Sequence, residues 1–142
     1  MKKVSHILSR KGNNVINISP DVLVIEALKL MDEKNIGSLV VMQNDQYLGI
    51  LTERDYARKI ILKGKSSADT PVHEIMSTGL PRITPENSID TCMHIMSENN
   101  IRYLPVFDHD KLCGIISIND VVTETILAQR ETIEHLQSYI HS

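Results

Sequence analysis

The chain has 142 residues, 42% of them hydrophobic, and a formal net charge of −3 at pH 7. A chain of this size can bury an ordinary core, and its slightly acidic charge disfavours nucleic acid as a general partner. The apolar runs are too short to span a membrane, the first residues do not form a signal peptide, and only two cysteines occur, so we expect a reduced, cytoplasmic protein.

The sequence predicts a short helical turn at residues 4–9, a polar loop at 10–14, and then a repeated unit. Residues 18–55 align without a gap with residues 83–120, a spacing of 65, and 12 of these 38 positions are identical. Roughly two or three identities would follow from shared composition alone. Each copy would be marginally stable by itself. We therefore expect one compact module made of two repeats, 1–66 and 67–142.

Each copy predicts a strand, a helix, a two-stranded hairpin and a second helix. In the first copy the predicted elements are 15–18, a helix starting near Ser19-Pro20-Asp21 and ending at Asn35, 39–42, 47–51 and 53–62. Met31, Met96 and Cys92 fall on the apolar faces of the first helices and are expected in the core.

The second copy is preceded by another helical turn at 72–77 and ends in a much longer helix, predicted over 120–139. A stripe of apolar residues follows this helix: Val122, Ile126, Ile133, Leu136 and Ile140. Their spacings alternate between three and four when Gln129 fills the missing step. Such a stripe needs a partner. Packing against its own domain and contact with a second chain are both open.

Residues 49–55 (Gly-Ile-Leu-Thr-Glu-Arg-Asp) and 114–120 (Gly-Ile-Ile-Ser-Ile-Asn-Asp) each end an apolar run in a hydroxyl residue, with an aspartate three positions later. This pattern is typical of a strand that runs into a helix. Backbone N–H groups at a helix N-terminus can hold a phosphate, and a carboxylate can bind ribose hydroxyls, so the pattern indicates a nucleotide site. The same residues also match a capping box, which needs no ligand.

Three features together resemble the CBS domain, the small module named after cystathionine β-synthase. They are Thr84-Pro85, the segment 100–106 (Asn-Ile-Arg-Tyr-Leu-Pro-Val), and the two Gly-h-h-Ser/Thr-x-x-Asp segments, where h is apolar. The resemblance covers essentially the whole chain. It implies an α/β (α+β) fold of tandem β-α-β-β-α CBS repeats, packed as a pseudo-two-fold pair with two clefts and a long C-terminal helix, and frequent dimerisation.

CBS-domain clefts commonly bind adenosine-containing ligands such as AMP, ADP, ATP, NAD or S-adenosylmethionine, and the resemblance implies such a ligand here, with no cofactor required. Matching positions assign ribose binding to Asp120 and Asp55. They assign phosphate contacts to Ser117 and Thr52. These are the residues that the strand-to-helix pattern singles out.

The second copy looks better equipped for this role. Arg102 stands at the start of the central strand, where a guanidinium can reach a phosphate, and Tyr103 beside it can line the base pocket. Backbone groups near Thr84 and Tyr103 would contact the adenine edge. Pro105, in the same motif, completes the set of expected cleft residues in this copy.

The first copy has Gly37 and Ser38 where the second has Arg102 and Tyr103. Its cleft, which includes Ser38, therefore lacks that cation and that ring. Arg54 is the residue that can supply positive charge there instead.

The sequence predicts no catalysis and no metal site. Its six histidines are scattered without metal-ligand spacing, and no P-loop, G-x-S-x-G or G-x-G-x-x-G segment occurs. We expect a homodimeric sensor that binds an adenine nucleotide between its repeats and changes its shape, or its affinity for a regulated enzyme or transporter. The alternative is a ligand-free interaction module that acts through its C-terminal helix.

Overall fold

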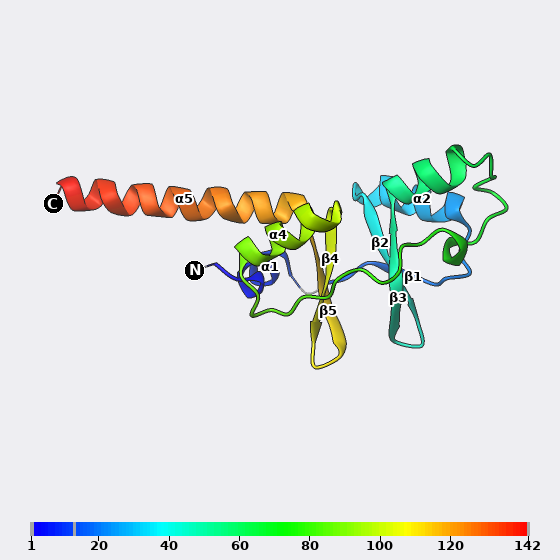
Figure 1. Ribbon diagram of the computed structural model, residues 1–142, viewed down its shortest axis with the longest axis horizontal. Helices are drawn as coiled ribbons and strands as arrows, with labels where there is room; N and C mark the ends of the chain where they lie inside the picture. Colours follow the sequence, from blue (N-terminus) through cyan, green and yellow to red (C-terminus); the bar gives the residue numbers. More distant parts are fainter. Residues whose placement is uncertain (1, 13, 142) are drawn as a thin grey trace. The chain divides into compact units, whose positions relative to one another are not determined.

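The computed structural model describes residues 2–12 and 14–141 (Figure 1). The chain forms two compact units, each with its own hydrophobic core. The first-repeat unit comprises residues 15–80. The second-repeat unit comprises residues 81–142 together with residues 1–14 at the start of the chain.

The first-repeat unit has a three-stranded sheet in the order β1-β2-β3, in which β1 and β2 are parallel and β2 and β3 are antiparallel. Its elements in chain order are β1 (Asn17–Ile18), α2 (Val24–Lys34), β2 (Ser38–Gln43), β3 (Gln46–Thr52), α3 (Glu53–Tyr56), the π-helical turn η1 (Ala57–Ile61) and the 3-10 turn η2 (Val72–Glu74). The hairpin turn places Asn44 and Asp45 at positive φ, a conformation that Asn and Asp tolerate.

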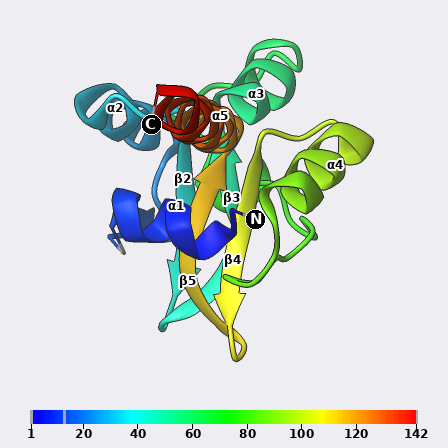
Figure 2. The same ribbon diagram turned by 90° about the vertical axis from the view of Figure 1, so that its left-hand side faces the viewer.

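The second-repeat unit repeats this arrangement with a β4–β5 hairpin. Its elements are α1 (Val4–Lys11), α4 (Ile89–Asn99), β4 (Tyr103–Asp108), β5 (Lys111–Ser117) and α5 (Ile118–His141). A single parallel bridge between Ile83 and Val106 stands where the other unit has β1. Figure 2 views the chain along α5, which contacts both α1 and α4.

Local details confirm the duplication. Asn35 and Asn100 end the equivalent helices α2 and α4 in the left-handed conformation, at φ 53° and 54°. Both hairpins shift register at the same place, after Val41 and after Val106. Two copies of one sequence pattern therefore fold into the same unit, and the predicted β-α-β-β-α order is confirmed.

The helical turns that precede the repeats pack in the opposite units. Val4 and Ile7 of α1 are fully buried in the core of the second-repeat unit. Val72 and Ile75 fill the core of the first-repeat unit. The compact units therefore do not coincide with the expected division at 66/67, because each half takes its covering turn from the segment ahead of the other repeat.

Some predicted boundaries were wrong. The first helix runs through Lys11 and ends at Gly12, so Arg10 and Lys11 are helical rather than part of the polar loop, and Asn13 of that loop lies outside the described residues. The strand expected over 15–18 is only two residues long. Helix α2 begins at Val24 instead of at Pro20, because Ser19 accepts a turn hydrogen bond from the N–H of Val22.

Two equivalent glycines mark places where a second segment crosses a strand closely. A Cβ on Gly49 would lie 2.5 Å from the backbone oxygen of Ser77, whereas a Cβ on Gly114 would lie 2.6 Å from the side chain of Leu8. The segment after η2 is held at Gly49 by paired backbone hydrogen bonds between Ile50 and Ser77. Gly49 therefore lies against backbone, whereas Gly114 lies against the tip of a side chain.

Candidate functional site

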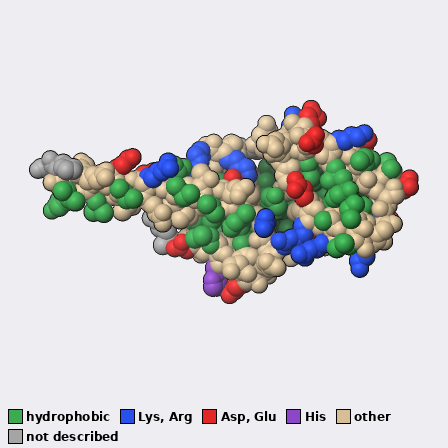
Figure 3. Space-filling model, turned by 90° about the horizontal axis from the view of Figure 1, so that it is seen from above, with side chains coloured by type: hydrophobic (Ala, Val, Ile, Leu, Met, Phe, Trp, Pro, Cys, Tyr) green, Lys and Arg blue, Asp and Glu red, His purple; other side chains and the backbone are tan. Residues whose placement is uncertain are grey.

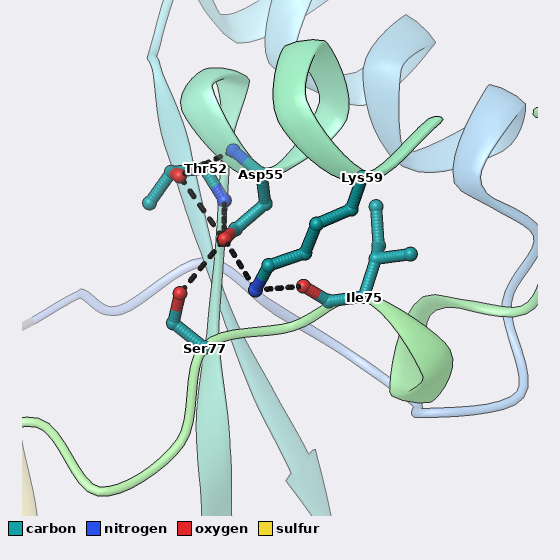
Figure 4. A network of polar contacts seen from close by, with 5 residues as sticks. All are labelled: Thr52, Asp55, Lys59, Ile75 and Ser77. Atoms are coloured by element: carbon teal, nitrogen blue, oxygen red, sulfur yellow. Dashed lines mark hydrogen bonds and ion pairs between the residues drawn. The ribbon is translucent and has the colours of Figure 1, made fainter. Parts of the chain in front are cut away.

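Asp55 lies at the junction of β3 and α3 and is only 5% exposed (Figure 4). Its Oδ2 accepts hydrogen bonds from the backbone N–H and the hydroxyl of Thr52, both at 3.0 Å. Its Oδ1 accepts from the hydroxyl of Ser77 at 2.8 Å and pairs with the Lys59 ammonium at 2.9 Å. Both carboxylate oxygens are therefore occupied by groups of the same unit.

Asp120 occupies the equivalent junction between β5 and α5 but has a different environment. Its Oδ2 accepts from the backbone N–H of Ser117 at 2.8 Å and pairs with the Lys11 ammonium at 2.8 Å. Within residues 2–12 and 14–141, its Oδ1 makes no hydrogen bond or ion pair. The side chain is 23% exposed, so one carboxylate oxygen remains available to a ligand.

Both junctions are capping boxes, as the pattern of a hydroxyl and an acid predicts. The hydroxyls of Thr52 and Ser117 accept hydrogen bonds from the backbone N–H groups of Asp55 and Asp120, at 3.1 and 3.2 Å. In both junctions capping uses only Oδ2 of the aspartate. Oδ1 of Asp55 is bound in addition by Ser77 and Lys59, whereas the described residues offer no such partners to Oδ1 of Asp120.

The cations that neutralise these carboxylates come from different elements in the two units. In the first-repeat unit Lys59, one turn after Asp55, also donates to the carbonyl oxygen of Ile75 in the chain after η2. The position 65 residues later is Glu124, which is buried and ion-paired with Arg10 of α1. Lys11, next to Arg10, takes over the pairing with the aspartate.

This exchange explains why α1 carries an Arg-Lys pair. Glu124 is 3% exposed, and a buried carboxylate without a partner would be costly. Lys11 binds the carbonyl oxygen of Ile115 in β5 as well as Asp120, so its ammonium lies beside the end of that strand. Positive charge next to Asp120 is thus supplied by the opening helix of the chain.

The ladder between β4 and β5 brings the other expected residues of the second repeat to the same end of the sheet. Tyr103 pairs with Ser117, and the backbone oxygen of Arg102 accepts a hydrogen bond from the N–H of Ile118. The Arg102 side chain is exposed and makes no hydrogen bond or ion pair within the described part of the chain. The backbones of Arg102, Tyr103 and Ser117 therefore meet at the end of the hairpin where Lys11 pairs with Asp120.

The remaining expected residues lie apart from this cluster or are already engaged. Thr84 is exposed in a turn in which its N–H donates to Asn87 Oδ1 and its carbonyl accepts from the Asn87 N–H. Pro105 is buried in β4, where its carbonyl accepts from Ile83. In the first repeat, Ser38 pairs with Thr52 across β2 and β3, and Arg54 is half-buried in α3.

The sequence motifs did not assign roles to Arg10, Lys11, Ser77 and Glu124. A signal was present in the repeat alignment, because Lys59 and Glu124 occupy equivalent positions with opposite charge. The partner that Glu124 needs could not be located without knowing that α1 packs in the second-repeat unit.

The two thiols are structural groups. Burial raises the pKa of the fully buried Cys92 from 9.0 to about 11. Burial, followed by the nearby negative charge of Asp108, raises the pKa of the half-buried Cys113. Both effects disfavour the reactive thiolate.

The described residues contain neither a metal site nor a helix that could span a membrane. No group of three or more His, Cys, Asp or Glu side chains could hold a metal ion in residues 2–12 and 14–141. Over the same residues, no helix has the length and hydropathy that a bilayer span requires. The described candidate site is thus the polar cluster around Asp120.

Two units of β-α-β-β-α order, each with a capped strand-to-helix junction, define a tandem-repeat module. The sequence profile of the CBS domain matches the chain twice, over residues 4–62 and 72–126. The chain therefore belongs to the CBS-domain family, as its motifs indicate. CBS-domain pairs are generally regulatory modules that bind adenosine-containing ligands.

Relatives in both sequence and structure span most of the chain. The mitochondrial CBS domain-containing protein CBSX3 of Arabidopsis thaliana is 36% identical over 146 residues, covering 96% of this chain and 71% of its own. A signal-transduction protein with CBS domains from Burkholderia ambifaria is 43% identical, with a TM-score of 0.86, and the match covers 90% of this chain and 96% of that structure.

Two further matches bear on activity and assembly. Inosine-5'-monophosphate dehydrogenase of Thermoplasma acidophilum is 34% identical over 112 residues, but the match covers 78% of this chain and only 21% of the enzyme. The hexameric CBS-CP12 protein of bloom-forming cyanobacteria is 27% identical, with a TM-score of 0.76, over 98% of this chain and 85% of that structure. Similarity to stand-alone CBS-domain proteins indicates a regulatory module rather than an enzyme.

Proposed function

We propose that this protein is a sensor of an adenine nucleotide, which it binds through the second repeat, with Asp120 accepting hydrogen bonds from the ribose hydroxyls. The observation that carries the proposal is that no described residue binds Oδ1 of Asp120, whereas both carboxylate oxygens of Asp55 are bound. The Asp120 carboxylate, with one oxygen bound and cations nearby, is suited to a polar ligand. The Asp55 carboxylate, with both oxygens bound, is suited to stabilising the fold.

The charges around Asp120 support a ligand that carries phosphate. Lys11 and Arg102 provide two cations near the N-terminus of α5, where the helix dipole also favours an anion. Ser117 lies at the same helix terminus. Tyr103, which is half-buried, pairs with Ser117 between β4 and β5. Ribose, phosphate and base each have a matching group in this cluster. AMP, ATP, NAD and S-adenosylmethionine remain the candidate ligands.

Occupancy would be transmitted through differential binding. A phosphate that pairs with Lys11 or Arg102 changes the charge balance at α1 and at the start of β4, and it favours the arrangement of the chain in which those cations are closest. Coupling free energies of about 1–3 kcal/mol are typical of such linkage. The output is then a change of shape, or of affinity for a regulated enzyme or transporter.

A thermal-shift series tests the proposal. AMP, ATP, NAD and S-adenosylmethionine are each added to the full chain; a ligand at 100 times its dissociation constant stabilises the folded state by about 2.7 kcal/mol. At least one is expected to raise the melting temperature. Failure of all four to shift it would contradict nucleotide sensing.

A matched pair of variants locates the site. Arg102→Ala and Lys111→Ala each remove one exposed cation, from opposite ends of the β4–β5 hairpin. Only Arg102→Ala is expected to reduce the ligand-induced shift, because Lys111 lies at the hairpin turn, away from Asp120. Equal reductions would point to a nonspecific charge effect.

The second candidate function is a ligand-free interaction module acting through α5. The favouring observation is the exposed apolar stripe of this helix, in which Ile133 and Leu136 are both 54% exposed. Packing of the stripe against its own unit, one of the two alternatives left open by the sequence, is contradicted by these exposures. Thermal shifts with nucleotide would separate this candidate from the sensor.

A further inference from the structure

Helix α5 carries an apolar stripe that its own unit does not cover. The α5 stripe consists of residues 122, 126, 129, 133, 136 and 140: Val, Ile, Gln, Ile, Leu and Ile. Its apolar members are between 43% and 75% exposed. Figure 3 shows hydrophobic side chains along one side of the outer part of α5.

The outer part of the helix needs a contact to be stable. All residues from 129 to 140 are exposed, while the buried contacts of α5 with its unit come from Val121 and Glu124. A segment of 12 residues is at the limit below which an isolated helix is marginal in water. Its stability in this sequence therefore calls for a partner along the exposed stripe.

We propose that the α5 stripe pairs with the same stripe of a second copy of this chain, as a parallel, in-register, two-stranded coiled coil. The stripe advances by alternating steps of four and three residues, the heptad spacing of a coiled coil. Ile126, Ile133 and Ile140 then occupy the a positions and Leu136 a d position, the combination that favours two strands. This inference is independent of ligand binding at Asp120.

Gln129 determines the direction of pairing. It occupies a d position, and in an antiparallel pair each d residue faces an a residue of the other helix. Every a residue of the stripe is isoleucine, so antiparallel pairing leaves the Gln129 amide against an apolar side chain, at the cost of an unsatisfied polar group. A parallel, in-register pair places the two Gln129 amides together, where they can hydrogen-bond to each other.

The surface beside the α5 stripe also fits a parallel, in-register pair. A hollow of about 490 Å³ lies between α5 and the start of α4, and its lining includes Thr125, Gln129 and Asp90. In a parallel pair Arg130 of the second copy, at an e position, faces the g-position Thr125 at the edge of this hollow. Asp90 is exposed and makes no ion pair within the described residues, so it can receive that guanidinium.

The mass of the full chain in solution tests the pairing. Light scattering is expected to give a dimer for the native chain and a monomer for Leu136→Lys. The matched control is Ser138→Lys, on the outward face of the same turn, which should stay dimeric. A native monomer, or a dimer that survives Leu136→Lys, would overturn the proposal.

Disulfide formation tests the direction. Leu136→Cys is made in a chain that carries Cys92→Ala and Cys113→Leu, the residues of the first repeat at those positions. Parallel pairing brings the two 136 positions within the roughly 4.4–6.8 Å between Cα atoms that a disulfide needs, so oxidation should give a cross-linked dimer. Ser138→Cys should not cross-link. A dimer that cross-links equally at both positions, or at neither, would contradict the parallel register.

Discussion

Replacing Asp55 by alanine should destabilise the fold far more than the same change at Asp120. At Asp55 the change removes four contacts of a carboxylate that is 5% exposed. A helix cap contributes about 0.5–2 kcal/mol, and a hydrogen bond to a charged group about 1.5–3 kcal/mol. Because Lys59 is 43% exposed, its ion pair adds less than about 1 kcal/mol.

These contributions overlap, so we expect Asp55→Ala to lower the free energy of unfolding by about 2–4 kcal/mol. Asp120→Ala loses one backbone hydrogen bond and an ion pair to a Lys11 side chain that is 39% exposed, so its cost should be about 1 kcal/mol. Urea unfolding followed by circular dichroism measures both, and a midpoint difference of about 1 M is expected. Equal losses, or a larger loss for Asp120→Ala, would refute the assignment of a structural role to Asp55.

Two further outcomes follow from packing and burial. Gly49→Ala should lower the melting temperature more than Gly114→Ala, because the new methyl group meets the Ser77 backbone at Gly49 but only a movable Leu8 side chain at Gly114. Thermal unfolding of both variants measures this, and the reverse order would contradict it. The raised pKa of Cys92, about 11 against 9.0, keeps the thiol protonated in the folded chain while the unfolded thiol ionises. Stability should therefore fall by about 2 kcal/mol as the pH rises from 9 to 11. Cys92→Ala, which installs the residue of the first repeat, should reduce this fall, and an unchanged pH dependence would count against it.

The sequence was sufficient for the element order because that order follows from short-range patterns. The helices end at Asn35 and Asn100, both in the left-handed conformation that asparagine tolerates, and the hairpin predicted from 39–42 and 47–51 turns at Asn44 and Asp45. The start of α2 was misplaced because Ser19-Pro20-Asp21 fits a turn as well as a helix N-terminus. Local preference does not decide between those two conformations.

The candidate site was predictable only in part. The hydroxyl and the aspartate of each junction follow from the motif, and the structure confirms that both junctions are capped. The difference between Asp55 and Asp120 depends on Ser77, Lys59 and Lys11, which reach the carboxylates through tertiary packing. Since each opening turn packs in the unit of the other repeat, no pattern within one repeat could identify those partners.

The proposed sensor role requires that the second repeat bind an adenine nucleotide through Asp120. Titration calorimetry of AMP or ATP into the native chain, Asp120→Asn and Asp55→Asn tests it most directly, because both variants keep the shape of the carboxylate and remove its charge. Asp120→Asn is expected to weaken binding by about tenfold or more, equivalent to about 1.4 kcal/mol, and Asp55→Asn is expected to change it little. Binding of the nucleotide to Asp120→Asn as tight as to the native chain would contradict the proposed site.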